Sequence, residues 1–377
     1  MTITVVCDVL GEENNGTTIA AMNLIRSLKA KGHEVRVICP DEEKRGLPGY
    51  YVVRKINLGP LNNYVKKNGV ALAKADKKVI YAAIHDADIV HLLVPFSLSK
   101  ATAKLAKRLN KPLTAGFHCQ AENFTNHIFL MNNRFVNRLT YKYFYRKVYR
   151  YVDCIHYPTE FIRDAFEEIV GKTKGCVISN GVSNEFQKRE VKRPQEFKDK
   201  FVILSIGRLS KEKSQQVLIK AVDKSKYREQ IQLIFAGAGP LYEKLVKLGS
   251  ILPIKPIFKF FKRQELIKLI NYADLYVHPA EIEIEAIACL EALSCGLVPV
   301  IANSPRSATR YFALTEKNLF ACNDAKDLAR RIDYWIEHPE EKKSLSQAYL
   351  SYKNKFDHDR CMDEMEKMLR RTAGAER

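Results

Sequence analysis

The sequence predicts an α/β protein made of two doubly wound, parallel-sheet domains that face each other across a cleft. Apolar runs rich in β-branched residues alternate with helical patterns, and this alternation occurs twice along the chain. The length of 377 residues is too great for one ordinary core and suits two domains. Residues 188–200 are charged and lack periodicity, so we interpret this segment as the linker between the domains.

Each alternation predicts a parallel sheet covered by helices on both faces, with ligands bound at the carboxyl ends of the strands. In the first, the expected strands are residues 3–9, 35–39, 89–94 and 113–117, and the expected helices are residues 18–30, 71–84 and 99–109. In the second, the expected strands are residues 201–206, 232–236, 275–278 and 298–301, and the expected helices are residues 214–222, 242–248, 263–271 and 287–294. Neither half has a Gly-x-Gly-x-x-Gly after its first strand, which argues against a dehydrogenase.

Composition excludes several classes of protein. The hydrophobic content of 46% is typical of a globular chain, and no apolar run approaches the ~18–20 residues that cross a bilayer. The first ten residues lack a basic leader and are interpreted as a buried strand instead of a signal peptide. The nine cysteines include no Cys-x-x-Cys pair, which argues against a disulfide scaffold or a zinc site and for a reducing cytoplasm.

The formal net charge of +19 predicts a partner of negative charge. A nucleotide, an anionic lipid and a nucleic acid all meet that description. The chain has no helix-turn-helix, zinc-finger spacing or aromatic RNA-binding motif, so nucleic acid is the outside alternative.

Two glutamates, Glu283 and Glu291, are the most informative feature of the chain. If a helix begins at Ile287, Glu291 lies one turn inside it, and Glu283 lies before its N-terminus. Backbone amides at a helix N-terminus favour an anion, here the amides near Ala286 and Ile287. One carboxylate can then bind hydroxyls of a ligand while these amides hold its phosphates. The alternative is a solvated acidic loop before a core helix.

Arg208 and Lys213 follow an expected strand and suit a diphosphate, because Arg makes forked contacts and Lys acts as a point charge. Gly237 and Gly239 permit close approach of a backbone to a base or a phosphate. The alternatives are two surface cations and an ordinary turn. No clustered His, Cys or Asp has the spacing of metal ligands, so we expect no metal.

Six short motifs occur in order along nearly the whole chain: Asn15-Gly16-Thr17-Thr18, Asp88-Ile-Val-His91, Ser179-Asn180-Gly181, Gly207-Arg208-Leu209, Ala236-Gly237-Ala-Gly239-Pro240 and the glutamate pair. This ordered set resembles the retaining, nucleotide-sugar-dependent glycosyltransferases of family 4, which have the GT-B fold. The resemblance implies a first domain of residues 1–190 that binds the acceptor, a second of residues 191–344 that binds the donor, and a C-terminal helix within about 345–377 that returns to the first.

The same resemblance assigns roles to the residues. The implied catalytic set is His118, Glu283, Arg208 and Lys213. The implied donor-binding set is Gly16, Arg208, Lys213, Gly237, Gly239, Glu283, Ala286, Ile287 and Glu291. Arg208 and Lys213 would hold the diphosphate, Glu291 the ribose hydroxyls, and Glu283 would lie near the sugar, with Glu285 as the local competitor. Glycolipid-forming members carry a loop similar to the one at His118, which would lie over the donor sugar with Glu122 near the acceptor hydroxyl.

The chain departs from the family pattern at three places. Ser214 and Ala286 stand where the family usually has glycine, and residues 304–308 replace a later glycine pair. The third departure bears most on which sugar fits.

Residues 134–151 contain six cations and no acidic residue, with aromatic residues between them: Arg134, Arg138, Lys142, Arg146, Lys147 and Arg150. A basic, aromatic helix of this kind suits an anionic membrane interface. The alternative is a helix that packs its tyrosines inward and exposes its cations to water.

These observations predict a cytoplasmic glycosyltransferase bound peripherally to the inner face of the cell membrane. The expected reaction moves a hexose, from UDP-glucose or UDP-galactose, to a lipid acceptor such as diacylglycerol, with no cofactor, no metal and no nucleic acid. One alternative transfers sugar to a polyprenyl-linked glycan of a capsule or cell wall. An alternative of another class is a non-catalytic partner subunit with the same fold.

Overall fold

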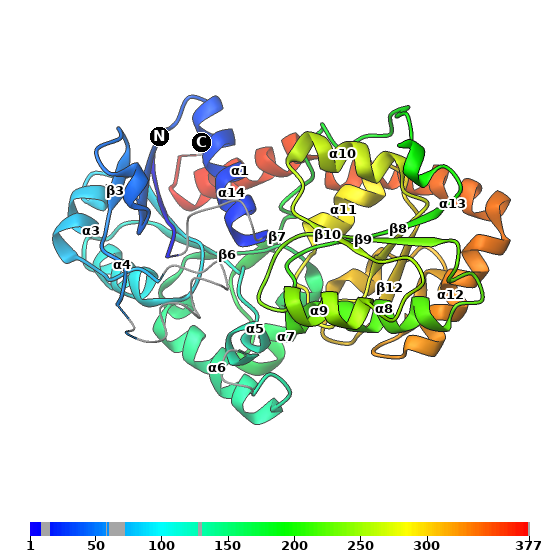
Figure 1. Ribbon diagram of the computed structural model, residues 1–377. Coiled ribbons are helices and arrows are strands. Elements are labelled where there is room, and N and C mark those ends of the chain that lie inside the picture. The colour runs from blue at the N-terminus through cyan, green and yellow to red at the C-terminus, as the bar shows by residue number, and fades with distance from the viewer. Residues whose placement is uncertain (9–15, 58, 60–71, 127–129, 376–377) are drawn as a thin grey trace. The chain divides into compact units, whose positions relative to one another are not determined.

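The computed structural model describes residues 1–8, 16–57, 59, 72–126 and 130–375, and it divides into two compact units (Figure 1). The first unit comprises Met1–Asn180 and the chain from Asp359 onward, and the second comprises Gly181–His358. Each unit contains one parallel sheet with helices on both faces. This finding confirms the predicted α/β class with two doubly wound domains.

Within the described residues, the first unit has a sheet of seven parallel strands in the order β3-β2-β1-β4-β5-β6-β7. The strands are β1 (Thr2–Val6), β2 (Glu34–Cys39), β3 (Tyr50–Val52), β4 (Ile89–Leu92), β5 (Leu113–Gly116), β6 (Cys154–Tyr157) and β7 (Gly175–Val177). The helices are α1 (Gly16–Ala30), α3 (Lys77–Ile84), α4 (Ser97–Arg108), α5 (Ala121–Asn126), α6 (Arg134–Lys147), α7 (Glu160–Val170) and α14 (His358–Thr372).

Alternate side chains of β1 serve the two faces of this sheet. Ile3 packs in a core with Leu24 of α1 and Met365 of α14, so these two helices cover one face. Thr4 points to the other face, where its hydroxyl donates a hydrogen bond of 2.7 Å to the carbonyl oxygen of Ala83 in α3.

The described part of the second unit has six parallel strands in the order β10-β9-β8-β11-β12-β13. The strands are β8 (Phe201–Ile206), β9 (Ile231–Ala236), β10 (Ile257–Lys259), β11 (Leu275–His278), β12 (Pro299–Asn303) and β13 (Leu319–Ala321). The helices are α8 (Gln215–Lys224), α9 (Tyr242–Gly249), α10 (Arg263–Tyr272), α11 (Ile287–Ser294), α12 (Ala325–Glu337) and α13 (Pro339–Tyr352). Figure 1 shows α10 and α11 on one side of the sheet and α8, α9 and α12 on the other.

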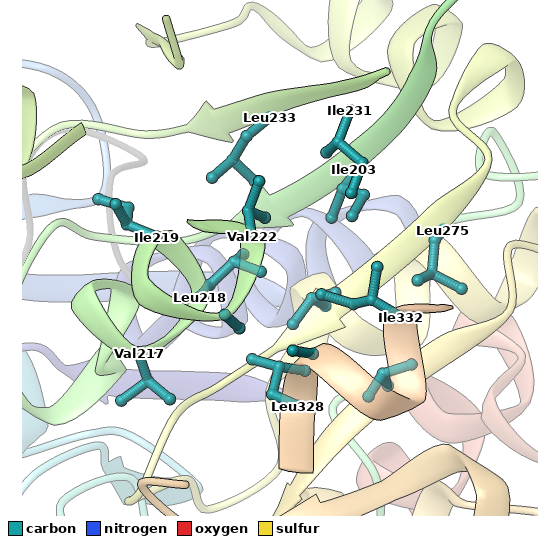
Figure 2. Close-up of a cluster of buried hydrophobic side chains, with 14 of the residues drawn as sticks. Ile203, Val217, Leu218, Ile219, Val222, Ile231, Leu233, Leu275, Leu328 and Ile332 are labelled. Atoms are coloured by element: carbon teal, nitrogen blue, oxygen red, sulfur yellow. The ribbon is translucent and has the colours of Figure 1, made fainter. Parts of the chain in front are cut away.

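Figure 2 shows the apolar core on the α8 and α12 side of the second sheet. Ile203 of β8 and Leu275 of β11 pack there with Val222 of α8, and all three are buried. Leu328 and Ile332 are four residues apart and therefore lie on one face of α12, which closes the core. The packing holds β8 and β11 side by side, and both strands lead into candidate site residues.

Both sheets reverse their strand order at a central pair of strands, which is β1 and β4 in the first unit and β8 and β11 in the second. Ligands of open α/β sheets bind beside the carboxyl ends of the strands at such a reversal. In the second unit, β8 leads to Arg208 and Lys213, and β11 leads to Glu283. The topology therefore brings together residues that are far apart in the sequence.

Several expected elements have different bounds in the structure. The helix expected at residues 71–84 begins at Lys77, because the side chain of Asp76 accepts hydrogen bonds from two backbone amides and caps the helix there. Residues 188–200, which we interpreted as the linker, lie in the second unit, where Arg193 pairs with Asp274 at 2.6 Å.

Candidate active site

The centre of the second unit's site is a chain of hydrogen bonds that ends on Glu283. The Lys213 ammonium, from the loop after β8, forms an ion pair with the Glu283 carboxylate. On the same carboxylate oxygen, His278 at the end of β11 places its Nε2 at 3.1 Å. Behind it, the Tyr276 hydroxyl lies 2.9 Å from His278 Nδ1. Tyr276, His278 and Glu283 are all buried.

This arrangement keeps Glu283 ionised. Burial alone would raise the pKa of the carboxyl, but the Lys213 charge and the hydrogen bond from His278 outweigh it and lower the pKa to about 2. Glu283 is therefore a buried anion over the whole physiological range, and the two donors satisfy the requirement that buried charges be paired.

The backbone of Glu283 is held by residues 304–308, the segment that departs from the family pattern. Glu283 forms a parallel β-bridge with Ser307, and the amide of Ala308 donates to the Glu283 carbonyl at 2.9 Å. Arg306 forms an ion pair with Glu281, two residues before Glu283. This segment therefore supports the position of the glutamate.

Arg208 is oriented by a buried carboxylate of its own loop. Its Nη2 donates a hydrogen bond of 2.7 Å to Glu212 Oε1, which also accepts one of 2.5 Å from the Ser210 hydroxyl. The Gln215 side-chain amide donates to the Arg208 carbonyl at 2.8 Å. Burial alone would raise the pKa of Glu212, but the Arg208 charge and the Ser210 hydrogen bond outweigh burial, so the pKa of Glu212 lies below its usual value. Each of the two predicted diphosphate cations thus faces one internal carboxylate.

Glu291 lies in α11 in a different setting. Its half-buried side chain forms no hydrogen bond or ion pair with any residue of the described ranges. Burial raises its pKa to about 8, and the more distant Arg263 charge only partly offsets this. An unpaired carboxyl of this kind suits a ligand that brings hydroxyl groups.

Ser214 and Ala286, the two positions where the family usually has glycine, both adopt left-handed backbone conformations, with φ of 50° and 60°. Ser214 immediately precedes α8, and Ala286 immediately precedes Ile287, the first residue of α11. Non-glycine residues are strained in this region, and such strain often lies at ligand sites. The backbone shape that glycine normally permits is therefore kept here without glycine.

Gly237 and Gly239 lie where another loop passes too close to leave room for a Cβ atom. A Cβ on Gly237 would lie 2.0 Å from the carbonyl oxygen of Gly207, and one on Gly239 would lie 2.5 Å from that of Leu209. The glycines therefore let the loop after β9 pack against the loop that carries Arg208. This contact accounts for both glycines within the unit, and their predicted role in donor binding stays a prediction.

The first unit places three histidines around the end of β5. The half-buried His118 follows β5, and its ring centroid lies 5.6 Å from that of His156 in β6, while His91 is buried in β4. Burial, His156 and His91 together hold the pKa of His118 well below its usual range, so its imidazole is neutral. A Cβ on Gly116 would lie 2.5 Å from His118 Nε2, so the ring folds back over that glycine.

The other first-unit candidates lie next to this loop. Gly16 begins α1, and the adjacent Thr17 hydroxyl lies 3.4 Å from the His118 carbonyl oxygen. Asn15 of the predicted glycine loop lies outside the described residues. Glu122 lies in α5, and its Oε2 accepts a hydrogen bond of 3.0 Å from the hydroxyl of Tyr141 in α6.

Helix α6 separates its aromatic residues between two faces. Tyr141, Phe144 and Tyr149 just beyond the helix are buried, whereas Tyr143 is 49% exposed. Phe135 and Leu139, which the sequence analysis did not single out, are 69% and 49% exposed and continue the Tyr143 stripe at four-residue spacing. None of the six cations forms an ion pair with a described residue, and all but the half-buried Lys142 are exposed: Arg134, Arg138, Lys142, Arg146, Lys147 and Arg150.

Sequence reasoning missed two residues of the second unit's site, His278 and Glu212. The sequence held a signal for His278. Tyr276 and His278 are two residues apart in a strand, so they lie on the same face of it, and the strand leads directly to Glu283. For Glu212 the sequence offered only its position beside Lys213.

Two kinds of feature are absent from the described residues. In the part of the chain that the structure describes, no helix is both long and apolar enough to cross a membrane. The same residues include no group of three or more His, Cys, Asp or Glu side chains placed to hold a metal ion.

Comparison with known proteins bears on both units. The family model described as Glycosyltransferase Family 4 matches residues 14–186, and the model described as Glycosyl transferases group 1 matches residues 186–350. The alpha-monoglucosyldiacylglycerol synthase of Streptococcus pneumoniae is 25% identical over 80% of this chain and 71% of its own length. The enzyme of the same name from Acholeplasma laidlawii is 25% identical over 86% of each chain.

Solved structures agree on the fold. Anabaena HepE in complex with UDP and glucose has a TM-score of 0.76 and 17% identity, over 98% of this chain and 99% of that chain. The catalytic domain of cholesterol-alpha-glucosyltransferase from Helicobacter pylori is 49% identical over 41% of this chain and 96% of its own, but its TM-score of 0.40 is too low to bear on the fold. The two family matches together span residues 14–350, so the chain belongs to the GT-B glycosyltransferases that join a family 4 half to a group 1 half.

Proposed function

We propose that this glycosyltransferase moves glucose from UDP-glucose, with retention of configuration and without a metal, to a membrane lipid acceptor such as diacylglycerol. The observation that carries the proposal is the Lys213–Glu283 pair at the strand reversal of the second unit. Arg208 lies in the same loop as Lys213, and Glu291, which has no partner among the described residues, lies in the first turns of α11. The names of the Streptococcus and Acholeplasma relatives support a glycolipid product.

The proposed chemistry follows from the charges at the site. Departure of the diphosphate develops negative charge on the leaving group and positive charge on the sugar. Arg208 and Lys213 neutralise the first, and the ionised Glu283 stabilises the second. Glu291 binds the ribose hydroxyls. Glu283 is not assigned as a nucleophile, because attack on the face from which the diphosphate departs also gives retention.

The first unit supplies the acceptor side in this proposal. His118 is neutral and can therefore donate or accept a hydrogen bond at the sugar. Glu122 is the candidate base for the acceptor hydroxyl, and its hydrogen bond with Tyr141 fixes it to α6. The same helix exposes the stripe of Phe135, Leu139 and Tyr143 among cations that form no ion pair with a described residue. A candidate base is thus attached to the helix that suits a lipid surface.

Membrane attachment through α6 is the second part of the proposal. An apolar stripe flanked by cations matches an interfacial helix, and each cation near an anionic surface contributes about 1 kcal/mol. The six cations of residues 134–150 are therefore sufficient to hold the enzyme at an anionic membrane. In this proposal the enzyme works at the cytoplasmic face, where nucleotide sugars and anionic lipids meet.

The reaction is tested by incubating the enzyme with radiolabelled UDP-glucose, UDP-galactose and GDP-mannose. Each donor is paired with diacylglycerol, a sterol, a polyprenyl-linked sugar and total membrane lipid, with and without EDTA. We expect glucose in diacylglycerol and unchanged transfer in EDTA. Label only in the polyprenyl-linked product would overturn the acceptor assignment. Loss of transfer in EDTA that Mg²⁺ restores would overturn metal independence.

Attachment is tested by vesicle sedimentation. Reversing Arg138, Lys142, Arg146 and Lys147 to Glu should abolish binding to vesicles rich in phosphatidylglycerol, and wild-type binding should weaken with salt. The matched control reverses four exposed lysines of the second unit that form no ion pair with a described residue: Lys220, Lys224, Lys244 and Lys247. The control changes the net charge equally and should still sediment. Equal loss in both variants would show that net charge, and not α6, is responsible.

A further inference from the structure

We infer that His278, oriented by Tyr276, is a positioning residue that holds Glu283 in place when Lys213 turns to the donor diphosphate. This inference rests on the proposed function, because it concerns the moment at which a donor occupies the site. It adds to the reaction two residues that neither the family resemblance nor the charge pattern of the sequence indicated.

The direction of each hydrogen bond follows from the groups involved. An ionised carboxylate only accepts, so His278 Nε2 must carry the hydrogen that it presents to Glu283 at 3.1 Å. The Tyr276 hydroxyl lies against the other ring nitrogen at 2.9 Å. Tyr276 therefore fixes the ring in the orientation that directs Nε2 at the carboxylate.

The need for this bond arises from competition for Lys213. In the structure, Lys213 pairs with Glu283, and Arg208 pairs with Glu212. A diphosphate carries more negative charge than one carboxylate and will draw both cations toward itself. Among the described residues, Glu283 then keeps one direct side-chain donor, His278, and a buried carboxylate without a donor is strongly disfavoured.

The described residues around Glu283 offer no substitute for His278. Among the described residues, Lys213 and His278 are the titratable groups that favour the ionised form of Glu283. Burial and the Glu283 charge in turn raise the pKa of Tyr276 and of Cys289 in α11, so both of these groups stay neutral beside the carboxylate. Glu291 acts on Tyr276 in the same direction. His278 is thus the group on which the ionisation of Glu283 depends once Lys213 is engaged.

Two substitutions at position 278 distinguish a role in positioning Glu283 from a role in the stability of the fold. The amide nitrogen of His278→Gln reaches the position of Nε2 and retains a donor for Glu283, whereas that of His278→Asn stops near Nδ1. Tyr276→Phe removes the hydroxyl that orients the ring. The matched control is Tyr349→Phe, which removes an equally buried hydroxyl that bonds the carbonyl of Phe312 at 3.2 Å, elsewhere in the second unit.

In the transfer assay, His278→Asn should lower kcat about tenfold or more, the range for losing a hydrogen bond to a charged group, with little change in KM for the donor. The acid limb of its kcat–pH profile should move upward, because Glu283 protonates more readily. His278→Gln should restore both quantities, and Tyr276→Phe should act in the same direction as Asn but more weakly. Equal kinetics for the Gln and Asn variants, or an unmoved acid limb, would overturn the inference.

A spectroscopic arm is independent of transfer. In protein labelled with ¹⁵N-histidine, the His278 signal is assigned by its absence from His278→Gln. We expect a hydrogen on Nε2 in wild type, and a shift of that signal in Glu283→Gln and in Tyr276→Phe but not in Tyr349→Phe. A bare Nε2, or a signal indifferent to Glu283→Gln, would overturn the inference. If wild type transferred no sugar at all, the proposed function would fail while this arm still decided the role of His278.

Discussion

The loop that carries Glu283 and the helix α11 that carries Glu291 place two carboxylates of one short motif in opposite electrostatic settings. Glu283 has an ammonium and an imidazole against it, and its pKa falls to about 2. Glu291 has no direct partner in the described chain, and burial raises its pKa to about 8. Sequence spacing alone therefore does not decide what a motif residue does. The partners decide it, and those of Glu283 come from the ends of β8 and β11.

The largest expected effect comes from removing the cation of Glu283. Lys213→Ala should lower turnover on the order of 10²-fold, because the diphosphate loses a charge and Glu283 loses its ion pair. Arg208→Ala should lower turnover comparably. Only Lys213→Ala should also raise the pH at which kcat/KM falls on the acid side, because kcat/KM reports the free enzyme, in which Lys213 pairs with Glu283.

The matched control is Lys211→Ala, an exposed cation of the same short loop with no ion pair to a described residue. Steady-state kinetics between pH 5 and 9 makes the comparison. Wild-type turnover in both the Lys213 and Arg208 variants would contradict the assignment of these two cations to the diphosphate.

A smaller effect concerns stability against pH. A carboxyl with a raised folded-state pKa makes the protein less stable as pH rises from the unfolded-state value near 4.5 to about 8. Glu291→Gln should therefore increase stability more at pH 8.5 than at pH 5.5, and the difference should be on the order of a few kcal/mol. Glu283→Gln should destabilise at both, because the contribution of a carboxyl with a lowered pKa is present above pH 4.5 and is lost only toward pH 2.

Urea unfolding can be followed through Trp335, the single tryptophan of the chain, which is buried in the core of the second unit. The signal therefore reports on the unit that contains both glutamates. A stabilisation by Glu291→Gln that is the same at both pH values would show that Glu291 does not titrate in this range.

The smallest effect concerns the left-handed residue between the two glutamates. Ala286→Gly relieves a strained φ of 60° but adds freedom to the unfolded chain, so we expect a net change within about 1 kcal/mol of zero. Ala288→Gly, two positions on and inside α11, relieves nothing and should destabilise by about 1 kcal/mol. The same urea titration measures both. Equal destabilisation would show that position 286 carries no strain.

The sequence predicted the fold where pattern was strong. The strand Phe201–Ile206 and the helix Ile287–Ser294 have the expected bounds, because each is a continuous apolar or small-residue run with clear ends. The strands Tyr50–Val52 and Gly175–Val177 were not predicted, since three residues are too few to show alternation. Tertiary pairing alone defines them.

The site was less predictable because its ionisation depends on contacts between distant residues. The motif indicated Lys213 and Glu283 separately, but their pairing and the part of His278 required the order of β8 and β11 in the sheet. In α6, composition indicated an aromatic, basic helix but not which of its aromatic side chains face the core. Tyr141 faces inward because it meets Phe117 and Phe166, which lies on α7, and this contact leaves Phe135 outside.

The most direct test of the contrast between the two glutamates is calorimetric binding of UDP and of UDP-glucose at pH 8.5 to wild type, Glu283→Gln and Glu291→Gln. Glu291→Gln should weaken both ligands about tenfold or more, because both carry the ribose. Glu283→Gln should bind UDP at least as tightly as wild type, since Lys213 is released from its carboxylate, but should lose the added affinity that glucose brings. Wild-type binding of UDP by Glu291→Gln, or equal weakening of both ligands by Glu283→Gln, would contradict the assignment of one glutamate to the sugar and the other to the ribose.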